Sequence, residues 1–391
     1  MGHHVARLGR IGATLALVVG AALALARPSP TAGSPLGAQV WAWGYNPNAE
    51  LGDGTTTNRD APVEVGGSTP LDGALKIAGE FDSGLALTND TTVWAWGYNG
   101  DGELGDGTTT NRLTPVQVGG STPLTGVTGI AGEGASGLAL KGDGTVWAWG
   151  SNPDGELGNG STTNSETPVQ VNGLTGVTAI AGEGSDGLAL ENDGTVWAWG
   201  YNGDGELGDG TTTESATPVR VTGLSGVTAI AGEAAGGLAL RSDGTVWAWG
   251  FNYYGQLGDG NTKGSDTPVP VSTLHGVTAI AGEGDGALAI EEDGTVWAWG
   301  YNGDGELGDG TTTNRLTPVQ LSGLTYPRAI AGEYRSGLAI ASYVNPTPTP
   351  TNTPTPTLAP TATDTPTPLP TATATSAPSP SRRLYLPDVF R

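Results

Sequence analysis

The tetrapeptide Trp-Ala-Trp-Gly occurs six times in this chain and contains all twelve of its tryptophans. The six copies begin at Trp41, Trp94, Trp147, Trp197, Trp247 and Trp297, with spacings of 53, 53, 50, 50 and 50 residues. A period near 50 residues with strand-like content is typical of a radial array of small β-sheets. Repetition also places the same chemistry in every unit, whereas an active site needs one asymmetric cluster. We therefore expect a binding protein and no enzyme.

Each repeat divides into four short strand-like segments. In the unit 177–221, three apolar segments at 177–181, 188–190 and 196–199 alternate with turns, and a fourth follows a long loop that starts at Tyr201. An Asp-Gly pair separates the second segment from the third, which is a strong hairpin signal because glycine adopts the positive φ of such turns. The sequence therefore predicts an all-β fold in which each repeat is one four-stranded blade.

The two boundary units are incomplete. Residues 40–65 contain only the third and fourth segments, and residues 326–341 contain only the first and second. We expect these halves to pair as one blade, because closing the array removes exposed sheet edges. The prediction is a six-bladed β-propeller over residues 38–343, closed by pairing of its N- and C-terminal strands.

Residues 1–37 have the features of an export signal. Arg7 and Arg10 precede the apolar run from Ile11 to Ala26, and Ala24-Leu25-Ala26 fits a small-x-small cleavage site. The run has 16 residues, whereas a membrane-spanning helix needs about 20. We expect a secreted or cell-surface protein of the bacterial export type, with an uncleaved N-terminal anchor as the alternative.

The C-terminal residues differ in composition from the repeats. Residues 344–381 are rich in Pro and Thr, which favours a disordered stalk with extended polyproline II character. Residues 382–391 form a short apolar segment with basic flanks, a candidate sorting tag. The chain has no cysteine, and His275 is the only histidine outside the predicted signal. Disulfides, thiolate metal sites and a histidine triad are thereby excluded.

One face of the predicted blades is expected to be acidic. Strands within a blade are antiparallel, so the first-to-second turn and the third-to-fourth loop share a face. Residues 38–343 contain 10 Lys and Arg against 37 Asp and Glu, a formal net charge of −27. This charge argues against a nucleic-acid partner and favours a basic partner surface or cations. Simple solvation of the carboxylates is the alternative.

The candidate binding carboxylates lie in two sets. The first turns carry Glu80, Glu133, Glu183, Glu233, Glu283 and Glu333. The long loops carry Asp101, Glu103, Asp204, Glu206, Asp304 and Glu306.

Aromatic residues start most of the long loops on this face. They are Tyr45, Tyr98, Tyr201, Phe251 and Tyr301, each followed by an asparagine. Such a pair could stack a sugar ring on the aromatic side chain while the amide binds hydroxyls; the alternative is an amide bonded to its own loop backbone. The tryptophans are expected to fill the space between blades, because large aromatics dominate core energetics.

No cofactor is expected, with calcium as the one alternative left open. Asn99-Gly100-Asp101-Gly102-Glu103 alternates oxygen-bearing side chains with glycines, which suits a hard cation. The spacing does not match the calcium loop of helix-loop-helix proteins.

The repeat resembles that of the regulator of chromosome condensation family over about residues 38–343. The resemblance is carried by the recurring Ile-Ala-Gly-Glu, Gly-Leu-Ala-Leu, Asp-Gly-Thr-Val-Trp-Ala-Trp-Gly and Leu-Gly-Asp-Gly segments. The exported bacterial type, with Thr-Pro-Val-x-Val ending each unit, is the most similar variant. The resemblance implies a propeller, usually of seven blades, so a seven-bladed arrangement is the alternative to six.

Two positions depart from the resembled repeat. The His-Ser pair common before the second strand is replaced, for example by Ser83-Gly84. The loop glutamine survives only at Gln256, with glutamate in the other complete loops.

We therefore expect an exported or surface-displayed, monomeric, non-enzymatic propeller. It would bind a protein or glycan at the cell envelope through its acidic, aromatic-bearing face, and would meet a membrane only through an uncleaved anchor. Two alternatives stay open. The first is a carbohydrate- or calcium-dependent lectin. The second is guanine-nucleotide exchange, which the resemblance implies for eukaryotic members and which an export signal disfavours.

Overall fold

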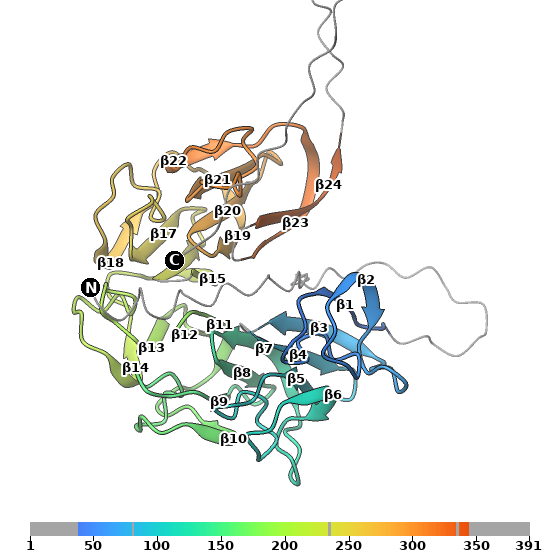
Figure 1. Cartoon of the computed structure of the whole chain (residues 1–391). Helices are drawn as coiled ribbons and strands as arrows, with labels where there is room; N and C mark the ends of the chain where they lie inside the picture. Colours follow the sequence, from blue (N-terminus) through green and yellow to red (C-terminus); the bar gives the residue numbers. More distant parts are fainter. Residues whose placement is uncertain (1–37, 80–81, 234–235, 334–335, 344–391) are drawn as a thin grey trace, which may run out of the picture. The chain divides into compact units, whose positions relative to one another are not determined.

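The computed structural model describes residues 38–79, 82–233, 236–333 and 336–343. The predicted export signal 1–37, the stalk 344–381 and the segment 382–391 lie outside these residues. The described part of the chain consists of 24 β-strands joined by turns and loops, and it contains no helix (Figure 1). The all-β prediction is confirmed. Among these residues there is accordingly no helix long and apolar enough to cross a membrane.

Five of the sheets have four strands each, joined as antiparallel meanders in chain order. The first strands are β3 (Ala74–Gly79), β7 (Val127–Glu133), β11 (Val177–Glu183), β15 (Val227–Glu233) and β19 (Val277–Glu283). The second strands are β4 (Ser83–Thr88), β8 (Ser136–Lys141), β12 (Asp186–Glu191), β16 (Gly236–Arg241) and β20 (Gly286–Glu291). The third strands are β5 (Val93–Gly97), β9 (Val146–Gly150), β13 (Val196–Gly200), β17 (Val246–Gly250) and β21 (Val296–Gly300). The fourth strands are β6 (Arg112–Gln117), β10 (Ser165–Gln170), β14 (Ser215–Arg220), β18 (Ser265–Pro270) and β22 (Arg315–Gln320).

The last glycine of each Trp-Ala-Trp-Gly motif directs the chain out of the third strand. Gly200 has a φ of +107°, and a Cβ there would lie 2.4 Å from the carbonyl oxygen of Ser185. The register between β13 and β14 shifts at this point, between Ala198 and Gly200. Glycine is required because an L side chain is strained at this φ and has no space. The long loop therefore leaves every sheet from the same place.

The second tryptophan of each motif packs between neighbouring blades. Trp199 is completely buried against residues of the preceding blade such as Leu138 and Leu157. Its indole N–H donates to the carbonyl oxygen of Glu156 at 2.7 Å, in the preceding long loop. The same bond recurs from Trp96, Trp149, Trp249 and Trp299. The prediction that the tryptophans fill the space between blades is confirmed for this position.

The tryptophan ring also explains the glycine that departs from the family pattern. A Cβ on Gly137 would lie 2.5 Å from the ring of Trp149, and Gly84 and Gly237 stand equally close to the corresponding rings. A serine there would overlap the indole unless the ring moved.

The two terminal half-units form separate two-stranded sheets. β1 (Trp41–Gly44) pairs with β2 (Arg59–Glu64), and β23 (Leu324–Glu333) pairs with β24 (Ser336–Tyr343). β1 is not hydrogen-bonded to β24, so the predicted closure by strand pairing is not confirmed. Closure depends on the sum of every blade-to-blade rotation, which no local sequence pattern determines.

Candidate binding face on the long loops

The long loop and the first turn of each blade lie on one face, as expected from the strand directions. The backbone N–H of Tyr201, which starts its loop, donates to the carbonyl oxygen of Ser185 in the turn of the same blade at 2.9 Å. Tyr98 bonds to Asp82 and Tyr301 to Asp285 in the same way. We call this surface the loop face.

Five of the six long loops also bind the next blade through their backbone. The N–H of Gly210 donates to the carbonyl oxygen of Asp266 at 2.8 Å, and Gly160 donates to Ala216 in the same manner. The bond recurs at Gly54, Gly107 and Gly260. Because these bonds use backbone atoms, the exposed side chains of the loops can vary without loss of the contact.

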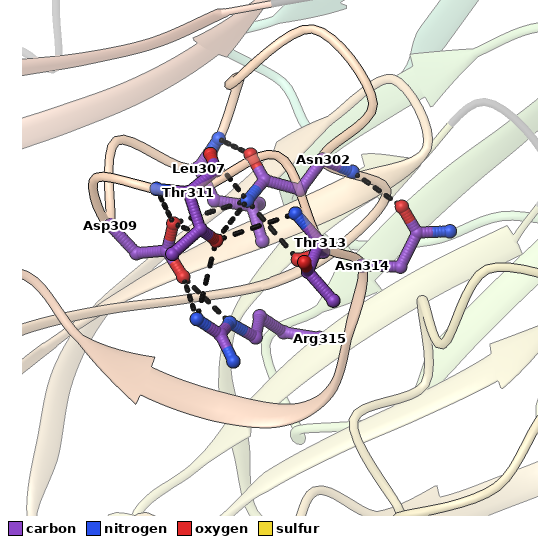
Figure 2. A network of polar contacts seen from close by, with 7 residues as sticks. All are labelled: Asn302, Leu307, Asp309, Thr311, Thr313, Asn314 and Arg315. Carbon is purple, nitrogen blue, oxygen red and sulfur yellow. Dashed lines mark hydrogen bonds and ion pairs between the residues drawn. The ribbon is translucent and has the colours of Figure 1, made fainter.

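A buried asparagine organises the interior of each loop. Figure 2 shows Asn302, whose amide nitrogen donates to the carbonyl oxygens of Thr311 and Thr313, each at 3.2 Å. Its amide oxygen accepts the N–H of Leu307 at 3.1 Å. The equivalent residues Asn46, Asn99, Asn152, Asn202 and Asn252 are buried and make corresponding bonds.

These bonds decide the role of the asparagines. Their amides bond the backbone of their own loops, which was one of the two alternatives predicted from the sequence. They are therefore not available to bind sugar hydroxyls.

Three loops add an ion pair to this network. The guanidinium of Arg315 contacts the Asp309 carboxylate with Nε···Oδ2 at 2.6 Å, and Thr311 donates to the other carboxylate oxygen at 2.8 Å (Figure 2). Burial raises the pKa of Asp309, but the bonds from Thr311 and Arg315 outweigh it and bring the pKa to about 2. Arg59 and Arg112 repeat the pair with Asp53 and Asp106. The other three loops carry Ser165, Ser215 and Ser265 at this position.

Two of the predicted surface glutamates are buried. Glu103 and Glu206 are 3% and 1% exposed, and each accepts the N–H of the aspartate two residues before it. The expectation that they lie on the surface is wrong, because the loop folds back over them. Burial raises the pKa of Glu206 to about 7, and it also raises the pKa of Glu103. These carboxylates form part of the loop framework.

The other predicted loop acids lie further out. Asp101, Asp204 and Asp304 are exposed, and Glu306 is half-buried with the same bond from its aspartate. Five first-turn glutamates end their strands beside the long loops: Glu133, Glu183, Glu233, Glu283 and Glu333. Glu80 lies outside the described residues. A binding role for these carboxylates stays a prediction.

Most of the predicted aromatic residues fold over their own loops. The hydroxyl of Tyr98 lies so close above Gly100 that a Cβ there would be 2.1 Å from it. Tyr201 covers Gly203 and Tyr301 covers Gly303 in the same way. These tyrosines, and Tyr45 in the first loop, are half-buried. A binding role for these tyrosines stays a prediction.

The pKa of the Tyr201 hydroxyl reflects the negative charge around it. Burial raises the pKa of its hydroxyl, and the nearby carboxylates of Glu206, Asp204, Glu214 and Asp154 raise it further. Asp154 belongs to the preceding loop, so acids of adjacent loops act on one tyrosine. This supports the expected acidity of the loop face.

The loop after β17 is different from the others. Phe251 stacks with Tyr253 at a centroid distance of 6.4 Å, and Tyr254 meets Tyr253 edge-on at 5.0 Å. Tyr254 also contacts Tyr301 of the next blade at 4.9 Å. We call these four residues the aromatic cluster. Our sequence analysis missed Tyr253 and Tyr254, although Tyr-Tyr in place of Gly-Asp at these loop positions was a visible signal.

The geometry does not favour calcium in these loops. The amide oxygen of Asn99 accepts the N–H of Leu104, and the Glu103 carboxylate accepts the N–H of Asp101. Within the described residues, no group of three or more His, Cys, Asp or Glu side chains could hold a metal ion.

A family model described as the RCC1-like domain matches residues 37–335. The chain belongs to this family. Among curated relatives, the RCC1 domain-containing protein RUG3 of Arabidopsis thaliana is 34% identical over 137 residues, which is 35% of this chain and 30% of RUG3. The ubiquitin ligase HERC2 of Homo sapiens is 32% identical over 34% of this chain and 3% of its own length. The chain thus matches less than a third of these relatives' length.

Solved structures share the fold, including that of Prp20, the yeast RCC1. Prp20p of Saccharomyces cerevisiae has a TM-score of 0.66 at 22% identity, covering 79% of this chain and 80% of Prp20p. Human WBSCR16 has a TM-score of 0.65 at 20% identity, covering 78% and 85%. The fold is therefore an RCC1-type β-propeller, as the resemblance in the repeat implied.

Proposed function

We propose that this RCC1-like propeller is an exported or surface-displayed, non-enzymatic module that binds a partner protein through its loop face. The main support is the preorganisation of that face. A buried asparagine bonds the interior of every long loop, and backbone bonds attach five of the six loops to the next blade. A surface ordered before binding loses little conformational entropy on association.

The charge of the face supports a partner with basic groups. Asp101, Asp204 and Asp304 project from equivalent, exposed positions of three loops. Complementary charges steer association and discriminate against wrong partners. The fold is compatible with such a role: the Prp20p structure is described together with binding to Gsp1p and histones.

Export is proposed from residues 1–37 and their apolar run. It favours an envelope partner over a nucleotide-exchange target inside the cell. A lectin role has less support, because the loop asparagines expected to bind hydroxyls are buried and already bonded.

The test is crosslinked capture of surface proteins by the full chain and two matched triple variants. D101N, D204N and D304N together remove three charges from the loop face. D143N, D193N and D243N remove three exposed charges from the turns between second and third strands, at the opposite ends of the strands. We expect the loop-face variant to lose capture about tenfold and the control to retain it. Equal capture by both variants would contradict the proposal.

Export is tested separately. We expect N-terminal sequencing of the cell-surface fraction to begin after Ala26, and a protein recovered only from the cytosol would refute this part.

A further inference from the structure

We propose that the aromatic cluster of Phe251, Tyr253, Tyr254 and Tyr301 is the anchoring site for a lysine- or arginine-rich segment of the partner protein. This rests on the proposed function, since the cluster lies on the loop face. It names the residues of the loop face that contribute most to binding, and it specifies the chemistry of the partner segment.

The cluster breaks the repetition of the loops. At the third and fourth loop positions the other complete units have Gly100-Asp101, Pro153-Asp154, Gly203-Asp204 and Gly303-Asp304. In three of these the leading tyrosine covers the glycine. Tyr253 takes the glycine's place here, and its side chain is 68% exposed. A large aromatic ring that lies mostly in solvent is a mark of an interaction site.

The rings offer faces in two orientations. Phe251 and Tyr253 are near-parallel, with 19° between their planes, whereas Tyr254 is almost perpendicular to Tyr253 at 87°. Tyr301 extends the surface onto the next blade at 63° to Tyr254.

The backbone beneath the cluster is held in place. The N–H of Tyr254 donates to the Gln256 side chain at 2.9 Å, and Gly255 packs directly on the backbone of Leu316 in the next blade. The rings are therefore presented by an ordered loop.

Electrostatics select a cationic segment. The two loops that carry the cluster, together with the first two residues of the strands that follow them, contain five acids against two bases: Asp259, Asp266, Asp304, Glu306 and Asp309 against Lys263 and Arg315. Arg315 is already paired with Asp309. A cation over an aromatic face is attracted by the ring quadrupole, and nearby carboxylates add to that attraction.

The same kind of contact occurs within this molecule. Lys141 lies 5.6 Å from the ring centre of Trp147, and Arg241 lies 5.7 Å from that of Trp247.

The polar groups around the cluster do not fit a sugar. Asn252 and Gln256 are 1% and 3% exposed and are bonded to their own loop and to Asp285. The sugar site expected from the sequence needs a side-chain amide that is free to bind hydroxyls beside the stacking ring, and neither amide is free here. A basic peptide needs only aromatic faces and surrounding negative charge.

The test is fluorescence anisotropy with a labelled peptide of about 15 residues that alternates Lys or Arg with Gly or Ser. The matched probe has Gln in place of every Lys and Arg. The variant Y253G/Y254D restores the Gly-Asp pair of neighbouring loops, so it has a precedent for folding in this chain. It also adds a negative charge, so weaker binding cannot come from lost attraction between charges. The control L75T changes another exposed apolar side chain, at the end of β3 away from the loop face, to the threonine that stands at the equivalent position 178.

We expect the full chain to bind the cationic peptide and not the Gln peptide. Y253G/Y254D should bind about tenfold more weakly or worse, and L75T should stay within about twofold. Urea midpoints of the variants check that they fold. Unchanged binding by Y253G/Y254D, equal binding of the Gln peptide, or binding of an oligosaccharide at the cluster would overturn the proposal.

The two proposals fail differently. If Y253G/Y254D still captures the partner while the loop-face triple variant does not, the anchor is wrong and the binding face stands. If the triple variant captures the partner as well as the unaltered protein does, the binding face itself is wrong.

Discussion

The interior blades and the first half-blade contain the same motif in different surroundings. Trp96 is completely buried beneath the preceding long loop, whereas the equivalent Trp43 in β1 is 37% exposed. Trp43 lies in β1, the first described strand, and among the described residues no long loop precedes it. The comparison shows that the motif supplies the large side chain, but the neighbouring blade buries it.

The strongest prediction is whether a disulfide can form between the first and last described strands, β1 and β24. If β1 paired with β24 as second and third strands pair elsewhere, Ala42 would lie opposite Leu338, just as Ala198 lies opposite Leu188. The chain has no cysteine, so any disulfide in the double variant A42C/L338C must involve the two introduced residues. Because β1 and β24 belong to separate sheets, we expect no intramolecular disulfide, measured by mass spectrometry under mild oxidation.

The pair L188C/A198C is the positive control for that experiment. A disulfide in monomeric A42C/L338C would show that the ends close as the sequence predicted.

The next largest effect tests burial of the motif directly. We expect Trp249→Ala to lower the free energy of unfolding by about 3 to 5 kcal/mol, because it leaves a cavity between blades and an unpaired Glu206 carbonyl. Trp43→Ala should cost less than about 1 kcal/mol, because this ring is already partly in water. Urea denaturation measures both. Equal costs would mean that Trp43 is buried in solution.

A smaller effect on stability is expected at Glu206, whose equivalent in the next blade is Gln256. Burial raises the pKa of Glu206 from 4.5 to about 7, and its Oε1 has no hydrogen-bond partner among the described residues. The folded state holds this proton more tightly than the unfolded chain, so this residue's contribution to stability falls as pH rises from about 4.5 to about 7. Glu206→Gln should therefore stabilise the protein by about 2 kcal/mol at pH 8 and leave it unchanged near pH 4.

Thermal or urea unfolding across this pH range is the measurement for Glu206→Gln. The reverse change, Gln256→Glu, replaces the amide that donates to Asp285 with a carboxylate and should destabilise at high pH. A Glu206→Gln gain that does not change with pH would argue against the raised pKa.

The smallest effect compares loops with and without arginine. Arg315→Ser introduces the residue that the loops at 165, 215 and 265 already have. Arg315 is 33% exposed, so solvent screens its pair with Asp309, and we expect a loss of only about 0.5 to 1 kcal/mol, reduced further in high salt. A loss comparable with that of Trp249→Ala would mean that the ion pair holds the loop together.

Most of the local structure could be predicted from particular residues. The Asp193-Gly194 turn, the alternation of Val196 and Trp197, and the direction of successive strands depend on neighbours in the sequence, so the strands and the shared loop face were predictable. The repeat itself indicated the propeller.

The candidate site was less predictable. Glu206 and Asp204 are equally acidic in sequence, yet one is buried and the other exposed. Tyr254 contacts Tyr301 from a different blade, 47 positions along the chain. Such contacts arise only when separate blades pack together.

Local backbone preferences and composition were enough to predict the all-β repeat, the position of each turn and the net negative charge. The solvent exposure of individual carboxylates, amides and rings, and the pairing of β1 with β24, became visible only in the folded molecule. Those outcomes depend on how a loop folds back on itself and how each blade is oriented against the next.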